Sequence, residues 1–331
     1  MMFDPTKVAL ITACEVPGIL FALVYDPQRN RLYGAGTDWA VYTVDLSAEK
    51  PVAEKRWTLH ENYVSALALL GDHLLSAGYD RRIIWTDAET GELVRRVDAH
   101  DGWVRELAVL PDRRRLVSVG DDMQVKLWNA ETGEHLRTLT GHTSRTPQGY
   151  ATALYALTVN PDGKHLASGD RVGTVCIWEA DTGKLVRKLE APAFYTYDAQ
   201  ARVRSIGGIR SLSFSPDGSL LAIAGIGKVT NVDGFVGPCR VELWDWQSAK
   251  LIRTWQDSHQ AVLNQVVFHP TQPWVIAGGG GDGGGILAFW DVNQNEPIHK
   301  AKPKGHLQRI VLSTEIGRLF ACGYDGFQVW G

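Results

Sequence analysis

The residues best suited to chemistry in this chain are its ten histidines and four cysteines. Imidazole nitrogens and thiolates bind zinc when they recur at short, fixed spacings such as His-x-x-x-His or Cys-x-x-Cys. Neither spacing occurs here, and the acidic residues are dispersed along the chain. Half of the histidines instead recur once in each of several similar segments, at His60, His100, His142, His259 and His306. This pattern predicts structural histidines, with no metal, no cofactor and no identified catalytic residue.

A run of glycines from Gly278 to Gly285, interrupted by Asp282, is the second feature with possible chemistry. Glycine-rich loops hold phosphate groups when a Lys-Ser or Lys-Thr pair and a helix N-terminus follow them. No such pair follows this run, and the sequence after it does not predict a helix. Because glycine adopts turn conformations readily, the run predicts a flexible hairpin.

The elements that position these residues form a repeat, whose most complete copy runs from Leu116 to His142. Short strand-like segments are separated by turn residues, and the alternation in "QVKLWN" has the period of two expected of a strand. Strands with similar ends recur 40 to 66 residues apart, at Val44, Trp85, Trp128, Trp178, Trp244, Trp290 and Trp330. A single unit of this kind cannot bury its own apolar face, so the seven copies predict one ring of packed units.

These segments resemble the Trp-Asp (WD) repeat family, whose β-propeller blades run Gly-His, strand, Ser, Asp, strand, Trp-Asp. The resemblance rests on the periodic histidines, the tryptophan-ended strands and the dipeptides Trp244-Asp245 and Trp290-Asp291, and it covers nearly the whole chain. It implies an all-β fold, a seven-bladed β-propeller of four-stranded antiparallel blades. The turn-rich segments "PDGKHLASGD" and "SPDGSLLA" resemble bacterial members of the family.

In this family a His, a Ser or Thr, an Asp and a Trp are linked by hydrogen bonds that brace the blade. Two blades match the pattern, one with His100, Ser118, Asp122 and Trp128, the other with His60, Ser76, Asp80 and Trp85 and a turn one residue shorter. The resemblance therefore implies structural roles for these eight residues. Three blades depart from the pattern: Val172 stands at the Asp position of blade four, blade five lacks the His, and Ala321 stands at the Ser position of blade seven.

The repeat leaves room for a single domain over residues 1–331. We expect its blades at approximately 18–60, 61–100, 101–142, 143–190, 205–258, 259–305 and 306–331. The seventh blade reaches only its third strand at Trp330. Residues 7–13 are therefore expected to supply its fourth strand and close the ring, which leaves no open sheet edge.

The composition is that of a globular protein, and we expect it in the cytoplasm because no disulfide framework is predicted. A net charge of −3 gives no bias toward nucleic acid or an anionic membrane surface. Asp4, Lys7, Glu15 and Pro17 interrupt the apolar N-terminal residues and argue against a signal peptide or a membrane span. The cysteines do not predict a disulfide framework, because Cys14 and Cys322 are expected in one sheet but two strands apart.

Four insertions interrupt the regular spacing of the repeats, at 143–152, 190–208, 225–240 and 278–285. The first two connect an outer strand to the next inner strand, and the other two connect a second strand to a third. In a propeller both kinds of connection open on one face, so all four are expected to project from the same face over blades four to six. Long loops on a rigid scaffold usually carry function.

The candidate partner-binding residues are aromatic and basic side chains on this face, because Tyr, Trp and Arg dominate binding hot spots. They are Tyr63, Trp103, Phe194, Tyr195, Tyr197, Arg202, Arg204, Arg210 and Phe235. Tyr63 and Trp103 each follow a repeat histidine by three residues, at the rim of the central channel. There they either bind a peptide or pack on the adjacent blade, just as the aromatic residues of 190–208 either contact a partner or cover their own blade.

The sequence therefore predicts a non-enzymatic scaffold that docks a protein or peptide partner. The docking surface would be the loop-bearing face over blades four to six together with the channel rim. The alternative is a small-ligand binder or an enzyme that uses the channel mouth, where dispersed carboxylates could converge. Nucleic-acid binding is the least favoured function because the net charge is slightly negative, and no membrane partner is expected.

Overall fold

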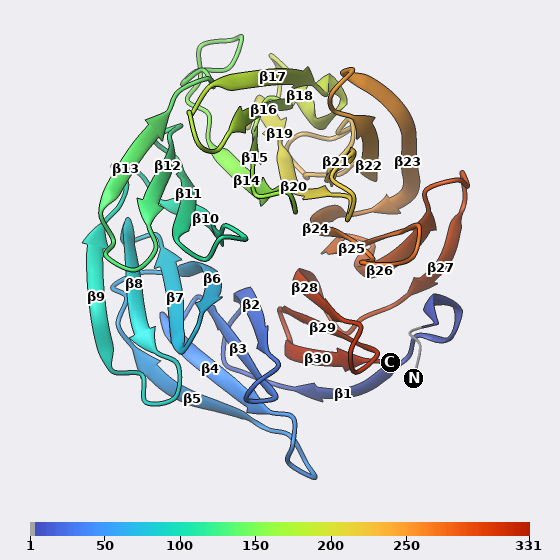
Figure 1. Ribbon diagram of the computed structural model, residues 1–331. Helices are drawn as coiled ribbons and strands as arrows, with labels where there is room; N and C mark the ends of the chain where they lie inside the picture. The colour runs from blue at the N-terminus through green and yellow to red at the C-terminus, as the bar shows by residue number, and fades with distance from the viewer. Residues whose placement is uncertain (1–3) are drawn as a thin grey trace.

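A computed structural model describes residues 4–331, which form seven four-stranded antiparallel sheets arranged as blades around a central axis (Figure 1). The inner strands of neighbouring blades contact one another around the whole ring, and the inner strand of the last blade contacts that of the first. The predicted all-β, seven-bladed propeller is confirmed.

Each of the first three blades runs from its inner to its outer strand in chain order. Blade one contains β2 (Leu20–Asp26), β3 (Arg31–Gly36), β4 (Ala40–Asp45) and β5 (Ala53–Thr58). Blade two contains β6 (Val64–Leu70), β7 (His73–Gly78), β8 (Arg82–Asp87) and β9 (Leu93–Asp98). Blade three contains β10 (Val104–Val109), β11 (Arg115–Gly120), β12 (Val125–Asn129) and β13 (His135–Leu139).

The next three blades follow the same order. Blade four contains β14 (Leu154–Val159), β15 (His165–Asp170), β16 (Thr174–Glu179) and β17 (Leu185–Glu190). Blade five contains β20 (Ile209–Phe214), β21 (Leu220–Ile226), β22 (Pro238–Asp245) and β23 (Lys250–Gln260). Blade six contains β24 (Val262–Phe268), β25 (Trp274–Gly281), β26 (Gly284–Asp291) and β27 (Pro297–Ala301). The 3-10 helix η2 (Pro192–Phe194) and the two-stranded hairpin of β18 (Tyr195–Tyr197) and β19 (Ser205–Gly207) lie between blades four and five.

The ring is closed by the N-terminal strand, as the sequence predicted. Blade seven contains β28 (Leu307–Ser313), β29 (Arg318–Gly323) and β30 (Gly326–Trp330), and β1 (Leu10–Cys14) pairs with β30 as its outer strand. The strand starts later than the predicted residue 7, because Pro5–Lys7 forms the 3-10 helix η1. Cys14 and Cys322 lie opposite Phe327 from its two sides, so both thiols are free.

The glycine run of blade six lies largely within paired strands. Gly281 pairs with Gly284 across a two-residue turn, so β25 and β26 form a tight hairpin. The lack of side chains allows a close approach to blade seven, since a Cβ atom on Gly280 would lie 2.5 Å from the Cβ of His306. The predicted hairpin is present, and its glycines serve packing between blades.

Every inner strand carries a β-bulge near its start, at the second residue in six blades and at the third, Asn264, in β24. In β2, for example, Leu20 pairs with Gly36 and Ala22 with Ala35, which leaves Phe21 without a partner. The same register shift occurs in β6, β10, β14, β20, β24 and β28. A bulge leaves one residue unpaired and re-aims its side chain. The fold therefore places one such residue from each blade at the same end of the central channel.

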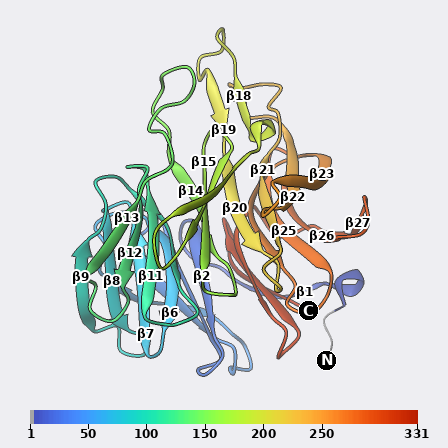
Figure 2. The same ribbon diagram turned by 45° about the horizontal axis from the view of Figure 1, so that its top comes forward.

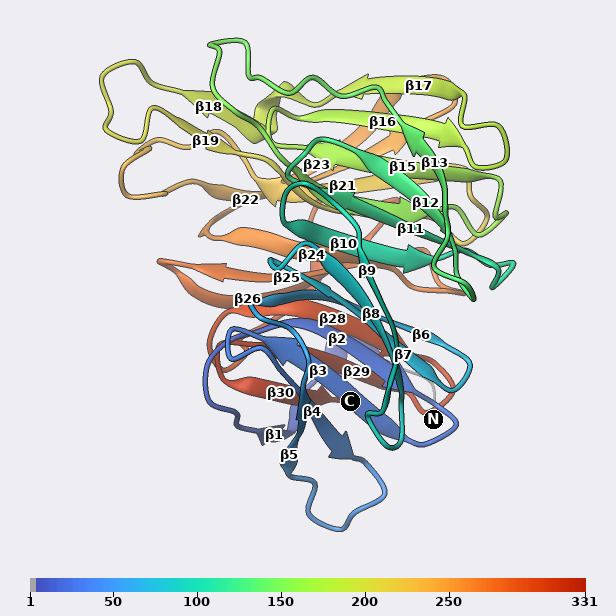
Figure 3. The same cartoon turned by 90° about the vertical axis from the view of Figure 1, so that its left-hand side faces the viewer.

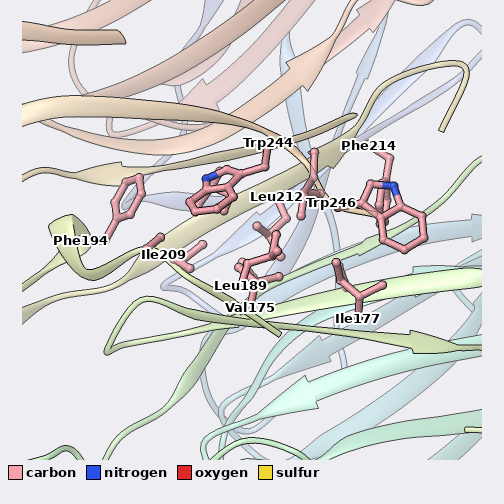
Figure 4. Packing of buried hydrophobic residues seen from close by; sticks show 14 residues of the cluster. Val175, Ile177, Leu189, Phe194, Ile209, Leu212, Phe214, Trp244 and Trp246 are labelled. Atoms are coloured by element: carbon pink, nitrogen blue, oxygen red, sulfur yellow. The ribbon is translucent and has the colours of Figure 1, made fainter. Parts of the chain in front are cut away.

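Apolar side chains pack between neighbouring blades, as the cluster between blades four and five shows (Figure 4). Val175 and Ile177 of blade four belong to one cluster with Leu212 and Trp246 of blade five. Phe194 lies at the edge of this cluster and is fully buried. Burial of a phenylalanine contributes about 2–3 kcal/mol. The prediction that Phe194 binds a partner is wrong, because its ring is part of the core.

Blade three contains the complete hydrogen-bond network that the resemblance implied. His100 Nδ1 lies 2.9 Å from the Asp122 carboxylate, and His100 Nε2 lies 2.8 Å from Ser118 Oγ. Since a carboxylate only accepts, Nδ1 carries the proton and Nε2 accepts from the serine hydroxyl. Ser118 Oγ in turn accepts from Trp128 Nε1 at 2.9 Å. Four side chains from two strands and two loops are thereby linked.

Blade two contains only part of this network. His60 contacts Asp80 and Ser76 at 2.8 Å each, but Trp85 Nε1 donates to the carbonyl of Ala130 in blade three. The shorter turn moves the strand by one residue, and a one-residue shift turns a side chain to the other face. Thr86 therefore takes the register position that Trp128 holds in blade three. The prediction that Trp85 braces its own blade is wrong.

Blades four, five and seven differ again. In blade four the carboxylate comes from Asp170, two residues before the expected position, and it lies 2.9 Å from His142 Nδ1. In blade five, which lacks the histidine, buried Glu242 accepts from Trp244 Nε1 at 2.9 Å. In blade seven Trp330 Nε1 is buried and has no hydrogen-bond partner among residues 4–331. Val172 stands at the usual Asp position of blade four, and Asp170 at the end of β15 supplies the carboxylate in its place.

The two serines provide a matched pair of test positions. Ser118→Ala leaves two buried donor or acceptor groups, on His100 and Trp128, without a partner, whereas Ser76→Ala leaves only His60. We expect losses in the free energy of unfolding of about 2 kcal/mol and about 1 kcal/mol, respectively. Urea denaturation measures both. Equal losses in the two variants would contradict the assignment of Trp85 to the neighbouring blade.

Asp122 makes the stability of blade three depend on pH. Burial would raise the pKa of its carboxyl group, but hydrogen bonds from His100 and from the backbone of Gln124 and Asp101 lower the pKa overall. A lowered folded-state pKa adds stability above the unfolded-state value, about 3.9, and that stability is lost as the pH falls through the folded-state pKa. Asp122→Asn is therefore expected to destabilise the protein at pH 7 and less so at pH 3. Denaturation at both pH values checks this, and a constant difference would argue against it.

Candidate functional site: channel mouth and loop crown

The seven bulge residues surround a small cavity at one end of the channel, which we call the channel mouth. The cavity has a volume of about 160 Å³. Tyr79 and Arg309 complete its lining. The bulge residues are Phe21, Ser65, Arg105, Tyr155, Arg210, Asn264 and Gln308. Each directly follows an apolar residue near the start of an inner strand, so the propeller itself assembles this set.

An ion pair crosses the channel below the mouth. Arg309 of blade seven donates to the carboxylate of Glu106 in blade three, and its Nε donates to the carbonyl of Phe21 at 3.1 Å. Burial raises the pKa of Glu106, and the charge of Arg309 opposes this shift. A deeper cavity of about 370 Å³ lies along the same inner strands. Both cavities share Arg210 and Arg309, so these two side chains lie at the boundary between them.

Aromatic rings form a stack on the rim of the mouth. Tyr79 and Trp103 are parallel, with centroids 4.2 Å apart and planes inclined by 4°, and Tyr63 lies 5.6 Å from Tyr79. Tyr63 and Trp103 keep 39% and 43% of their surface exposed. We call these three residues the rim stack. The two residues named from the sequence are thus brought together by a third, Tyr79.

Arg105 fixes the rim stack in place. Its guanidinium carbon lies 4.9 Å from the ring centroids of both Tyr79 and Trp103. Two of its nitrogens donate to Asp121 at 2.6 and 2.8 Å, and a third donates to the Tyr79 hydroxyl at 2.6 Å. Bidentate pairing and ring stacking restrict the guanidinium to one geometry. The exposed aromatic surface is therefore held rigidly.

Arg210 occupies a different environment from the one the sequence indicated. It lies in the mouth and not among the inserted loops, with its guanidinium carbon 4.4 Å from the centroid of Tyr155. Arg105 approaches the same ring at 5.2 Å. Within residues 4–331 no carboxylate lies within ion-pair distance of Arg210. Burial lowers the pKa of this guanidinium, and Arg105 and Arg171 add to the effect.

Three insertions contact one another above blades four and five, and we call residues 143–152, 190–208 and 225–240 the loop crown. The Tyr195 hydroxyl donates to Gln148 Oε1 at 2.7 Å, and the Val203 amide donates to Asp233 at 3.0 Å. A small apolar cluster that includes Val229 and Val232 packs beneath them. Figure 2 shows the 143–152 loop rising beside the β18–β19 hairpin, and Figure 3 shows that hairpin and the β21–β22 loop projecting from one face.

The remaining candidates lie on the loop crown. Tyr197 and Phe235 are 37% and 36% exposed, and Arg202 and Arg204 are exposed as well. Tyr195 is only partly exposed because of its bond to Gln148. In this insertion Phe194 is therefore buried, and the residues at the hairpin tip are exposed.

Sequence reasoning missed Tyr79, Arg105 and Tyr155, which complete the mouth and its rim. A signal for two of them was present, since Arg105 and Tyr155 occupy the second position of an inner strand, and every blade has its bulge at this position or the next. No position-specific signal marks Tyr79. Within residues 4–331 no group of three or more His, Cys, Asp or Glu side chains could hold a metal ion. Among the same residues, no helix has the length and apolar character needed to span a membrane.

The buried ion pair gives a sharp test of the channel geometry. Glu106→Leu leaves Arg309 buried without its counter-ion, which is expected to cost about 3–5 kcal/mol in the free energy of unfolding. Replacing both residues, as Glu106→Leu with Arg309→Met, removes the uncompensated charge and is expected to recover most of that loss. Urea denaturation of the two single variants and the double variant measures the coupling. Additive losses would show that the two side chains do not interact.

Comparison with known proteins identifies part of the repeat directly. The profile of the family described as "WD domain, G-beta repeat" matches residues 91–129, 133–179 and 249–291. Fungal proteins named nuclear distribution protein PAC1 are similar over short stretches. The protein of Arthroderma otae is 34% identical over 95 residues, covering 25% of this chain and 21% of that protein. The protein of Coccidioides posadasii is 36% identical over 93 residues, covering 25% and 20%.

This chain thus spans about a fifth of the length of the curated relatives it matches. These relatives are fungal, and they give no support to the resemblance with bacterial members. The matched segments lie in blades two to six and include the strands that end at Trp128, Trp178 and Trp290. This chain is a seven-bladed β-propeller by its closed ring of seven four-stranded sheets, and it is similar to the WD repeat over those matched segments.

Proposed function

We propose that this propeller is a non-enzymatic scaffold that docks a peptide or protein partner on the face bearing the loop crown and the rim stack. The observation that carries the proposal is the rim stack itself. Tyr63 and Trp103 expose large aromatic surfaces, yet Arg105 and Tyr79 hold them in one geometry. Rigid aromatic anchors lose little conformational entropy on binding and are typical of hot spots.

The loop crown extends this surface on the same face. Tyr197, Arg204 and Phe235 are exposed on neighbouring loops. The hydrogen bonds from Tyr195 to Gln148 and from Val203 to Asp233 join these loops into one unit. Arg202 and Arg204 carry no carboxylate partner within residues 4–331, so they are available to acidic groups of a partner. We place the protein in the cytoplasm, since its four cysteines are free.

The alternative is a small-ligand binder or enzyme that uses the channel mouth, and one observation favours it. Arg105, Glu106, Arg210 and Arg309 meet there, and burial raises the pKa of Tyr79. Glu106 and Asp121 are nevertheless both bound to arginines. A carboxylate held in this way is a poor general base, so ligand binding is favoured over catalysis. The partial similarity to nuclear distribution proteins does not extend their role to this chain.

Affinity capture with matched variants tests the docking face. We expect specific partners to be retained by the wild-type protein and by Ile252→Ala, which removes an equally exposed side chain from the outer strand of blade five. Trp103→Ala is expected to retain at least tenfold less of the same partners, as removal of a hot spot of about 2 kcal/mol implies. Thermal melting confirms that all three proteins are folded. Equal retention by Trp103→Ala would exclude the rim stack as the docking surface.

A further inference from the structure

The charges in the channel mouth do not balance. Arg105 is paired with Asp121, and Arg309 is paired with Glu106. Arg210 is the remaining cation of the lining and has no carboxylate partner within residues 4–331. Nearby Arg171 donates to the carbonyl of Ser205 and brings no negative charge. The mouth thus carries a net positive charge although the whole chain carries −3.

An arginine in this position costs free energy unless an anion compensates it. Arg210 is partly buried, lies against the face of Tyr155 and borders both cavities of the channel. Removal of a cation from water is unfavourable, and a charged partner in such a low-dielectric site is held more strongly than in water. Polar groups around it are still available, since the side-chain amide of Gln308 has no partner within residues 4–331.

We propose that the channel mouth is a binding site for a single carboxylate group, which pairs with the guanidinium of Arg210 and accepts from the amide of Gln308. One unpaired arginine in the lining matches the single charge of a carboxylate, whereas a phosphate dianion would leave excess negative charge in the mouth. The planar fork of arginine suits a carboxylate geometrically. The flat ring of Tyr155, which lines the mouth, completes the site with apolar surface for the body of the ligand.

The carboxylate belongs either to a small molecule or to an acidic side chain of a docked peptide. The peptide source rests on the proposed docking function, because the mouth opens at the rim stack. The small-molecule source does not depend on docking. Two pairs of probes separate the sources. Benzoate and benzamide differ only in charge, as do two acetylated heptapeptides of glycine and serine with a central Glu or Gln.

Isothermal titration with the folded full-length protein measures the dissociation constants. We expect the wild-type protein to bind at least one carboxylate probe roughly tenfold more tightly than its neutral analogue, as a charge-assisted pair implies. Arg210→Gln is expected to lose this preference and Arg210→Lys to keep part of it. Arg114→Gln, which removes an exposed arginine from the turn between β10 and β11, is the matched control and is expected to bind as the wild type does.

Each outcome bears on the assignment. A preference for benzoate alone supports a small-molecule ligand, and a preference for the Glu peptide supports a docked side chain. No preference in the wild-type protein, an equal preference in Arg210→Gln, or tighter binding of inorganic phosphate than of either carboxylate would overturn it. Trp103→Ala in the same titrations separates the two proposals, since failure of docking leaves benzoate binding intact. If the carboxylate site is wrong but docking is right, partner capture still depends on Trp103 and does not depend on Arg210.

Discussion

The structure depends on one backbone constraint, the bulge at the start of every inner strand. The bulge brings the residue that precedes the inner strand close to the second strand of the blade. In blade one, a Cβ atom on Gly36 of β3 would lie 1.8 Å from the carbonyl oxygen of Ile19, just before β2. Glycine satisfies this constraint in most blades. The same distortion turns the unpaired side chain toward the channel. The fold therefore sets where these seven side chains lie, and the residue types at the seven positions set the charge and polarity of the mouth.

The side-chain hydrogen bonds that brace the blades differ from blade to blade, and the differences follow the register of the paired strands. Blade three links four side chains, whereas blade two sends its tryptophan to the neighbouring blade and thereby joins the two. Blade four uses Asp170, which occupies the register position that glycine holds in blade three. Blade seven leaves Trp330 Nε1 unpaired, and the strand β1 stabilises this blade instead by completing its sheet. Different residues thus meet the same requirement for stable sheets.

The two parts of the candidate site differ in how they are held. Side chains of the mouth project from strands and are fixed by ion pairs and ring stacking, so their geometry is set by the ring as a whole. The loop crown has its own small apolar cluster and a few hydrogen bonds between loops. A rigid recess beside an extended loop surface suits a ligand that places one group in the recess and the rest across the face.

Local sequence determined the class of fold, the number of blades and the closure by the N-terminal strand. It could do so because strand alternation and repeat spacing depend on residues close in the chain. It also indicated the face with the insertions and two residues of the rim stack. Position along a strand cannot by itself fix the direction of a side chain, since a one-residue change in a turn moved Trp85 to the opposite face.

Only the tertiary structure decided which candidates are exposed and which residues meet. It buried Phe194 between two blades, moved Arg210 from the expected loop surface into the mouth, and added Tyr79, Arg105 and Tyr155. Glu106 and Arg309 are 203 residues apart in the chain, yet they form an ion pair across the channel. Contacts of this kind arise from closure of the ring, which brings distant blades together, and no pattern of neighbouring residues records them.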